Sequence, residues 1–305
     1  MREGLPSRIL ADSYGVRTTQ LSKRFGSLQA VDGVELNVPL GAFYLLVGPN
    51  GAGKTTTFRM LLGLLAPDAG HAEVAGIEST PDGLARAHIG LVPETENSPY
   101  PYLRVDRLLA HEASYRGTWD DAYARELVKL LEVPLSRPFG KLSKGQARRV
   151  RLVCALAHRP SVLLLDEPTD GLDPVARDTV QRVLTEHLAD TPTTVLVATH
   201  LVHEMERLAD HIGVMRSGRL VAQLSIADLD MRLRRYEFEA PDGWSAPASL
   251  AVGRRNGSPH EHRWTMWGDE TGVATALRDS GARVRSAQGL SLEDATVALL
   301  TWEES

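Results

Sequence analysis

The sequence has 305 residues, which is room for one large domain and one small domain that each bury a core. Its 34 basic and 39 acidic residues leave a net charge of −5, so no overall positive field attracts nucleic acid, and we expect no nucleic-acid partner. The single cysteine excludes an internal disulfide, which suits a reducing cytoplasm, and no apolar run approaches the roughly 18 residues that span a bilayer.

The chain begins with a segment, residues 1–15, that we interpret as a flexible leader, because no apolar stretch like that of a secretory signal follows its arginines. Strands are predicted at 16–21 and, from apolar alternation, at 34–38. Phe25 follows the first of these strands. It is either a core residue or a platform on which a base stacks, and the pattern alone favours the core.

An apolar run at 43–47, a glycine-rich loop and a helix-compatible run at 57–62 come next. The loop matches G-x-x-x-x-G-K-[ST], in which backbone amides and the positive end of the following helix hold phosphate oxygens. Lys54 reaches the terminal phosphates and Thr55 offers its hydroxyl to Mg²⁺. The sequence therefore predicts nucleoside triphosphate binding by Gly48, Pro49, Asn50, Gly51, Ala52, Gly53, Lys54, Thr55 and Thr56.

A strand at 89–94 ends with Glu94, and the sequence is then mainly helical over 97–158. One amphipathic helix is predicted at 119–132, where Val133 and Pro134 end it. Cys154 lies in a later apolar run and is interpreted as a small buried core residue.

Ser143 is a good N-cap for a helix that runs to residue 158. Gly145 comes two residues after this cap, where glycine costs a helix about 1 kcal/mol relative to alanine. We therefore expect something to approach its backbone, and an ordinary capped helix remains the alternative.

An apolar strand at 162–167 ends in two carboxylates, Asp166 and Glu167. Ligands of parallel α/β sheets bind at the carboxyl ends of strands, and two unpaired acids are costly to bury there. Beside a phosphate loop, we assign Asp166 to Mg²⁺ and Glu167 to the attacking water. A further strand at 194–200 ends in His200, for which a structural and a functional role both stay open.

The remaining sequence predicts a hairpin at 212–221, a helix at 226–235 and then a small α+β unit without a catalytic constellation. Its tryptophans, Trp244, Trp264 and Trp267, are interpreted as core residues. The unit is expected to contain strands at 236–240, 262–266 and 282–286 and helices at 272–279 and 292–302, the last capped by Ser291.

The ordered motifs resemble the ATP-binding subunit of an ABC transporter over residues 16–222. The resemblance implies an α/β fold: a P-loop ABC-type ATPase domain at 16–224, with a parallel core sheet, an antiparallel β subdomain and a helical subdomain, plus the small α+β domain at 225–305. It also indicates the exporter-type subfamily of bacteria and archaea. The subfamily is indicated by residues 119–121, residues 142–145 and the C-terminal α+β extension. The motifs that carry the family resemblance are Phe25, Gly48–Thr56, Glu94, Leu142–Gln146, Val162–Glu167, Asp170–Pro174 and His200.

The resemblance assigns roles to the motif residues. Phe25 would stack on adenine, Asp166 and Thr55 would hold Mg²⁺ with Glu94 nearby, and His200 would contact the γ-phosphate. Lys54 and Glu167 would join His200 in catalysis, Glu167 by polarising the hydrolytic water. Ser143 and Gly145 would contact the γ-phosphate bound by the opposite subunit, so hydrolysis would require a head-to-tail dimer. Gln146 and Asp173 are also expected to bind nucleotide.

Three residues depart from the family pattern. Glu94 stands where glutamine is usual and either strengthens Mg²⁺ binding or repels the γ-phosphate. Lys144 replaces the second glycine of the signature motif, and Asp170 replaces a common serine. None of these exchanges removes a catalytic group, so activity is still expected.

We expect a separate transmembrane permease subunit as partner, and either a homodimer or a pair with a paralogous ATP-binding subunit. The partner would hold the chain on the inner face of the membrane and would dock around residues 94–104. Tyr100 and Tyr102 either form a docking pocket there or pack within the loop. Two alternatives remain: a soluble ABC ATPase that acts on DNA or ribosomes, and an ATP-sensing regulatory module with weak hydrolysis.

Overall fold

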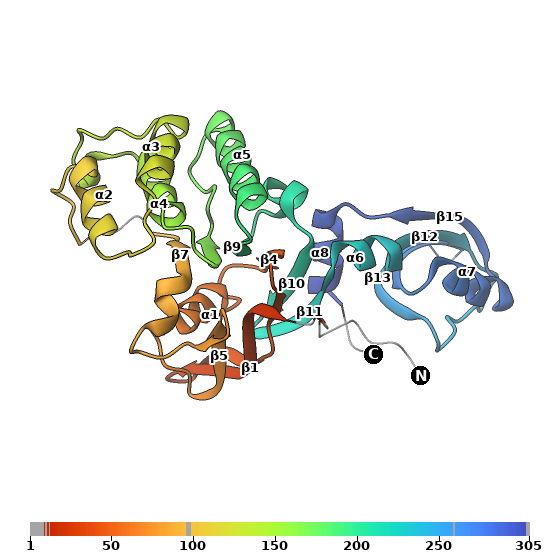
Figure 1. Cartoon of the computed structure of the whole chain (residues 1–305). Coiled ribbons are helices and arrows are strands. Elements are labelled where there is room, and N and C mark those ends of the chain that lie inside the picture. The colour runs from red at the N-terminus through yellow and green to blue at the C-terminus, as the bar shows by residue number, and fades with distance from the viewer. Residues whose placement is uncertain (1–8, 10, 12, 96–98, 259, 303–305) are drawn as a thin grey trace.

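The computed structural model describes residues 9, 11, 13–95, 99–258 and 260–302 and contains three β-sheets (Figure 1). Two sheets and most helices form the N-terminal part (residues 14–225), and the third sheet belongs to the C-terminal unit (residues 226–302). Within these described ranges, no helix is long and apolar enough to cross a bilayer.

The central sheet has six strands in the order β11-β10-β4-β9-β8-β7. Neighbours from β10 to β7 are parallel, and β11 closes one edge as the antiparallel arm of a hairpin. Every residue of β4 and β8 is buried, as their continuous apolar runs predict. The strands are β4 (Phe43–Val47), β7 (Ile89–Val92), β8 (Val162–Asp166), β9 (Thr194–Thr199), β10 (His211–Arg216) and β11 (Arg219–Ser225).

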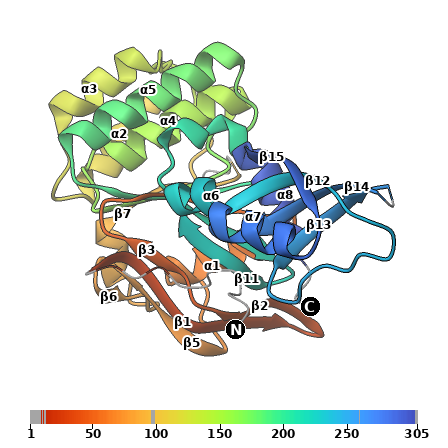
Figure 2. The same ribbon diagram turned by 90° about the vertical axis from the view of Figure 1, so that its right-hand side faces the viewer.

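Side chains of the central sheet alternate between two hydrophobic cores. Phe43, Leu45 and Val47 face the core that α2 to α5 cover, and Tyr44 and Leu46 face the core shared with α1 and the second sheet. Figure 2 shows α2 to α5 above the central sheet, and α1 and the second sheet below it. The helices are α1 (Lys54–Leu61), α2 (Val105–Ser114), α3 (Asp121–Leu130), α4 (Lys144–Leu156) and α5 (Pro174–Asp190).

The second sheet is antiparallel, in the order β2-β1-β5-β6, with β3 paired to the other end of β1. The strand predicted at 34–38 is wrong as a single element. The Thr18 hydroxyl donates to the Val34 carbonyl and accepts from the Leu36 amide, both at 2.8 Å, where the chain passes from one strand to the next. The strands are β1 (Tyr14–Phe25), β2 (Leu28–Val34), β3 (Asn37–Pro39), β5 (Ala69–Val74) and β6 (Ile77–Glu78).

Two predicted helix starts are confirmed by their caps. The Asp120 carboxylate accepts from the Tyr123 amide (2.9 Å) before α3, and Ser143 forms a reciprocal capping box with Gln146 before α4. Short 3₁₀ helices connect the larger elements: η1 (Leu84–His88), η2 (Phe139–Lys141), η3 (Val202–Glu204) and η4 (Glu206–Leu208).

The C-terminal unit has an antiparallel sheet in the order β13-β14-β12-β15, with α7 packed on one face. The helix predicted at 226–235 ends early, at Arg232, because β12 begins with the buried Leu233. β13 was not predicted. The elements are α6 (Ile226–Arg232), β12 (Leu233–Glu239), β13 (Ala251–Gly257), β14 (Glu261–Trp267), α7 (Glu270–Asp279), β15 (Arg283–Gly289) and α8 (Leu292–Leu300).

The last helix, α8, returns to the N-terminal part (Figure 1). Its Leu292 and Leu299 belong to the hydrophobic core of the N-terminal part, as does Trp267, whereas Trp264 lies in the separate core of the C-terminal unit. Trp244 packs against that second core. Of the three predicted core tryptophans, Trp267 therefore belongs to the first core, and Trp264 and Trp244 belong to the second. A domain boundary near residue 225 stays a prediction.

Candidate nucleotide-binding site

The phosphate loop connects β4 to α1, as predicted. Gly53, the N-cap residue of α1, has φ +105° and provides no side-chain cap, so the first amides of the helix remain available to a ligand. A side chain on Gly48 or Gly53 would place its Cβ only 2.3 Å from the Met215 carbonyl oxygen or 2.5 Å from that of Ala30. Glycine at both positions therefore lets the loop lie against neighbouring backbone.

Lys54 is the buried cation of this loop. Its Nζ donates to the carbonyls of Gly48 (2.6 Å) and Pro49 (3.3 Å). Burial lowers the pKa of its ammonium, and the carboxylates of Glu167 and Asp166 act in the opposite direction. The ammonium thus lies beside both the loop and the acidic residues that follow β8.

Asp166 ends β8 and is buried. Burial raises the pKa of its carboxyl group to about 6, the Thr55 hydroxyl that donates to it lowers the pKa, and the charges of Glu94 and Glu167 raise it further. A hydroxyl and a carboxylate are oxygen ligands of the kind that Mg²⁺ takes, and a divalent cation would offset the crowded negative charge. The donor set therefore fits Mg²⁺, with Thr55 and Asp166 as the groups able to hold it, and Glu94 lines the same cavity.

Glu167 follows Asp166 and is held by the chain after β9. Its carboxylate accepts from the Thr199 hydroxyl (2.9 Å) and the His200 amide (3.1 Å), and its Oε1 lies 2.8 Å from His200 Nδ1. The ends of the parallel strands β8 and β9 therefore lie together, and Glu167 and His200 are in direct contact.

A cavity of about 300 Å³ opens between the phosphate loop and these acids, a volume that suits a small ligand. Phe25 lines it with a side chain that is 47% exposed, so the interpretation of this residue as core is wrong. It stands at the end of β1, opposite Leu28, where it can cover a planar group. The lining residues are Phe25, Leu28, Ala30, Asn50, Gly51, Ala52, Gly53, Lys54, Thr55, Thr56, Glu94, Asp166 and Glu167.

Six predicted nucleotide-binding residues are not among those that line this cavity: Gly48 and Pro49 at the start of the phosphate loop, and four residues at the starts of α4 and α5. Ser143, Gly145 and Gln146 begin α4, and Asp173 caps α5 by accepting from the Ala176 amide at 3.0 Å. An added Cβ on Gly145 would come within 3.2 Å of Leu172 Cδ2. The group that approaches the Gly145 backbone within one chain is therefore this leucine.

The two unusual residues Lys144 and Asp170 form an ion pair with each other. Lys144 Nζ lies 2.6 Å from Asp170 Oδ2, and this contact lowers the pKa of the Asp170 carboxyl group. The lysine stem crosses Gly171, where an added Cβ would come within 2.8 Å of Lys144 Cδ. The two departures from the family pattern therefore complement each other in space.

Arg148 of α4 was not identified from the sequence, although it is 1% exposed and contacts both acidic strand ends. It donates to the carbonyls of Pro93 (2.6 Å), Asp166 (3.2 Å) and Glu94 (3.0 Å). Two more arginines lie in the same helix, and only the folded chain shows which one is buried.

A phosphate loop, a buried lysine and paired carboxylates at parallel strand ends define a P-loop nucleoside triphosphatase. A family model described as "ABC transporter" matches residues 31–170, and a second model, of an AAA domain, matches residues 135–206.

The relatives are ATP-binding proteins. The bacitracin transport ATP-binding protein BcrA of Bacillus licheniformis is 34% identical over 74% of this chain and 75% of its own. The Nod factor export ATP-binding protein I of Burkholderia orbicola is 41% identical over 67% and 68%.

Solved structures agree with these matches. An ATP-binding subunit of an ABC transporter has a TM-score of 0.63 at 29% identity, over 70% of this chain and 91% of its own. The dimeric cassette MJ0796, a bacterial ABC transporter cassette, has a TM-score of 0.61 at 25% identity, over 69% and 98%.

The chain belongs to the ABC transporter family, as an ATP-binding subunit. It is an ATPase with the predicted P-loop fold, and subunits of this kind dimerise and work with separate membrane permeases.

Proposed function

We propose that this chain hydrolyses Mg-ATP between two ATP-binding subunits and thereby drives export through a separate membrane subunit. The name of one relative, Nod factor export ATP-binding protein I, supports the direction, and that of the other concerns bacitracin transport. Because the transported substance would contact the permease, this chain gives no substrate.

The contact that carries the proposal is the one between Glu167 and His200. A carboxylate that accepts from Thr199 and from the His200 backbone is fixed in direction, as a group that orients a water molecule must be. Lys54 and the loop amides would hold the phosphates. Mg²⁺ held by Thr55, Asp166 and Glu94 would neutralise charge on the phosphate oxygens.

The residues that begin α4 would serve the nucleotide of the second subunit. Ser143, Gly145 and Gln146 lie away from the cavity of their own chain, and a dimeric cassette is among the similar structures. A homodimer or a pair with a paralogous subunit would satisfy this arrangement equally.

The membrane partner would dock on the segment 94–104 and the neighbouring α2, and would hold the chain on the cytoplasmic side of the membrane. Tyr102 and Tyr115 are 93% and 76% exposed, and the His111 ring lies edge-on between those of Tyr100 and Tyr115. Exposed aromatic groups of this kind favour a protein interface.

The first experiment replaces the proposed water-polarising carboxylate. In Glu167→Gln we expect ATP turnover to fall by at least about 100-fold while ATP binding persists, so that an ATP-bound dimer accumulates. Turnover is measured as phosphate release, and the dimer by size-exclusion chromatography with ATP. Glu186→Gln, an exposed position on α5, is the matched control and should behave like the native chain. Undiminished turnover in Glu167→Gln would reject the assignment.

The second candidate function is an ATP sensor with weak hydrolysis, which Glu94 favours because its negative charge acts on Asp166. Turnover of the native chain is compared with that of Glu94→Gln. Measurable turnover in the native chain supports the transport ATPase. Negligible turnover in both, together with tight ATP binding, supports the sensor.

A further inference from the structure

Glu167 has an unusual backbone conformation. Its φ is +50°, in the left-handed region that residues other than glycine rarely adopt. Such a residue persists only when the structure on both sides holds it in place. On one side, the Glu167 amide donates to the Ala198 carbonyl (2.9 Å) and thereby fixes the end of β8 against β9.

On the other side, the loop that follows Glu167 is held by Glu204 of η3. The side chain of Glu204 is 3% exposed, and one of its carboxylate oxygens accepts from the Thr169 hydroxyl. Its other oxygen lies 2.7 Å from Arg177 Nη1, and Arg177 Nε donates to the Leu172 carbonyl at 3.0 Å. A buried carboxylate therefore holds residues 169–172 through one hydrogen bond, from Thr169, and one ion pair, with Arg177.

The same short segment holds Glu167 and this loop. Thr199 and His200 contact the Glu167 carboxylate, and Glu204, four residues later, contacts the loop beyond it. The Glu204 carbonyl in turn accepts from the Gln181 side chain of α5. Residues 199–204 thus hold both the Glu167 side chain and the loop that follows it.

We propose that Glu204 is a positioning residue, which holds the loop after Glu167 so that the Glu167 carboxylate keeps its direction toward the attacking water. This inference rests on the proposed role of Glu167. It adds a second group, outside the nucleotide cavity, on which hydrolysis depends.

Helix α8 of the C-terminal unit packs against the segment that contains Glu204. η3 packs against α8, and Val202 and Met205 share a hydrophobic core with Leu292 and Leu299 of that helix. A displacement of α8 would therefore reach Glu204, which connects the C-terminal unit to the hydrolytic site.

The test uses the full-length chain with Glu204→Gln, which keeps the size of the side chain and removes its charge. We expect kcat for ATP hydrolysis to fall at least about tenfold, as a small misplacement of a reacting group does, while KM for ATP stays within about twofold. Glu206→Gln, two residues away on η4 and exposed, is the matched control and should leave both constants unchanged.

Thr169→Val provides a milder variant, which removes one hydroxyl that donates to Glu204. It should lower kcat in the same way, Thr169→Ser should restore it, and the double variant with Glu204→Gln should lose no more than Glu204→Gln alone. If Glu204→Gln does not fold, this pair of threonine variants decides the question.

The proposal is overturned if Glu204→Gln and Thr169→Val keep native kcat, including the case in which only the melting temperature falls. Its failure differs from failure of the proposed function. Inactive Glu167→Gln with fully active Glu204→Gln rejects only the positioning role. Active Glu167→Gln rejects the role of Glu167 itself and leaves Glu204 with nothing to position.

Discussion

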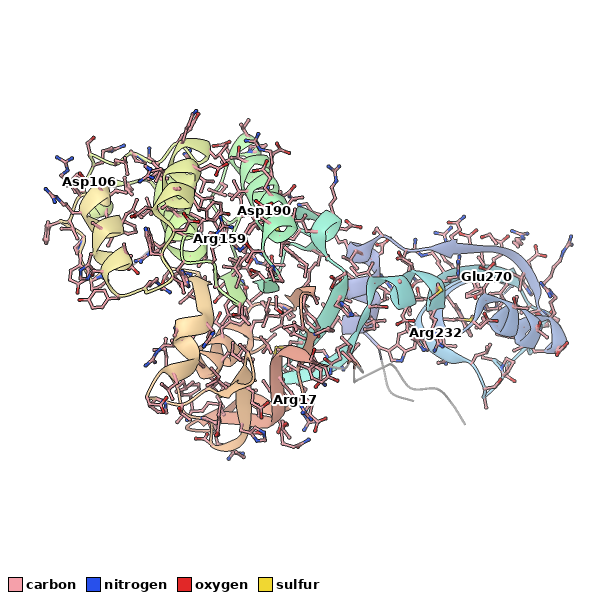
Figure 3. All side chains as sticks on the ribbon, viewed as in Figure 1. Arg17, Asp106, Arg159, Asp190, Arg232 and Glu270 are labelled. Carbon is pink, nitrogen blue, oxygen red and sulfur yellow. The ribbon has the colours of Figure 1, made fainter. Side chains whose placement is uncertain are left out.

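The N-terminal part and the C-terminal unit differ in where their sheets place charged side chains. In the central sheet, parallel β8 and β9 end side by side, so that Asp166, Glu167 and His200 gather at one edge. In the antiparallel sheet of the C-terminal unit, Arg263 and Glu237 face each other across neighbouring strands and pair at 2.8 Å, largely in solvent. Figure 3 shows charged side chains over the surface of both parts.

The difference teaches that strand direction, more than the number of charges, decides whether a site forms. Parallel strands bring their carboxyl ends to one edge, where polar groups from several strands gather. Antiparallel strands place opposite charges next to each other, as between Arg285 of β15 and Glu239 of the neighbouring β12. Arg234 of β12 also pairs with Glu270 of α7 at 3.2 Å in the C-terminal unit, where Figure 3 labels Glu270.

Helix α8 belongs to the C-terminal unit but packs into the core of the N-terminal part. The largest expected effect therefore comes from removing a buried side chain of α8. Leu299 is fully buried in the core of the N-terminal part. We expect Leu299→Ala to lower the free energy of unfolding by about 2–5 kcal/mol, because it leaves a cavity. The measurement is urea unfolding followed by tryptophan fluorescence.

Two matched variants accompany this measurement. Val297→Ala changes a residue of α8 that is 40% exposed and should alter stability by less than about 0.5 kcal/mol. Leu277→Ala changes the core of the C-terminal unit alone and should leave ATP binding intact. Equal, small effects of Leu299→Ala and Val297→Ala would contradict the assignment of α8 to the shared core.

A second effect is expected from pH. Burial and nearby arginines lower the pKa values of His158 and His187 to about 4, against 6.5 for an ordinary histidine. The unfolded chain then binds protons more readily, so stability is full above pH 6.5 and decreases as pH falls toward 4. Each histidine contributes up to about 3 kcal/mol of this loss.

The pH effect is measured as the free energy of unfolding between pH 7.5 and 4.5 in the native chain and in His187→Gln. The variant should lose part of the slope, because its side chain carries no proton. His203→Gln, at an exposed position, should keep the full slope. Parallel slopes in native chain and His187→Gln would show that His187 is not responsible.

The smallest effect concerns the pair of Lys144 and Asp170. Both side chains are about half exposed, so a double-mutant cycle with Lys144→Gln and Asp170→Asn should give a coupling of about 0.2–1 kcal/mol in unfolding. The cycle of Arg263 and Glu237 in the C-terminal unit should give a similar value. The comparison of the two parts is supported if the Lys144 and Asp170 variants change ATP turnover and the Arg263 and Glu237 variants do not. It is weakened if both sets of variants change turnover or if neither set does.

The sequence predicted the central sheet well, because β4, β8 and β9 are short apolar runs that the structure buries completely. Prediction was poorer where tertiary contacts decide. β13 contains Gly253, Arg254 and Arg255 and forms at an edge, where no apolar alternation is needed. The strand predicted at 34–38 divides because Thr18, distant in sequence, bonds to both of its halves.

In the site, too, the residues that follow a local sequence pattern were predicted and those that depend on tertiary contacts were not. Gly48–Thr56, Asp166 and Glu167 follow from a local pattern beside an apolar strand, and the structure places residues 50–56 and the two acids around one cavity. The pattern around Phe25 could not show that its ring faces this cavity. Arg148 and Glu204 were missed because their partners lie far away in the chain, and sequence spacing carries no information about such contacts.

The buried position of Cys154 gives the molecule a built-in probe. Burial raises the pKa of this thiol to about 12, and it is the only cysteine in the sequence. A thiol reagent would therefore label the native chain only when α4 opens, so that the labelling rate reports local opening. A cysteine introduced at an exposed position such as Tyr102 would react far faster and could carry a fluorophore with little background.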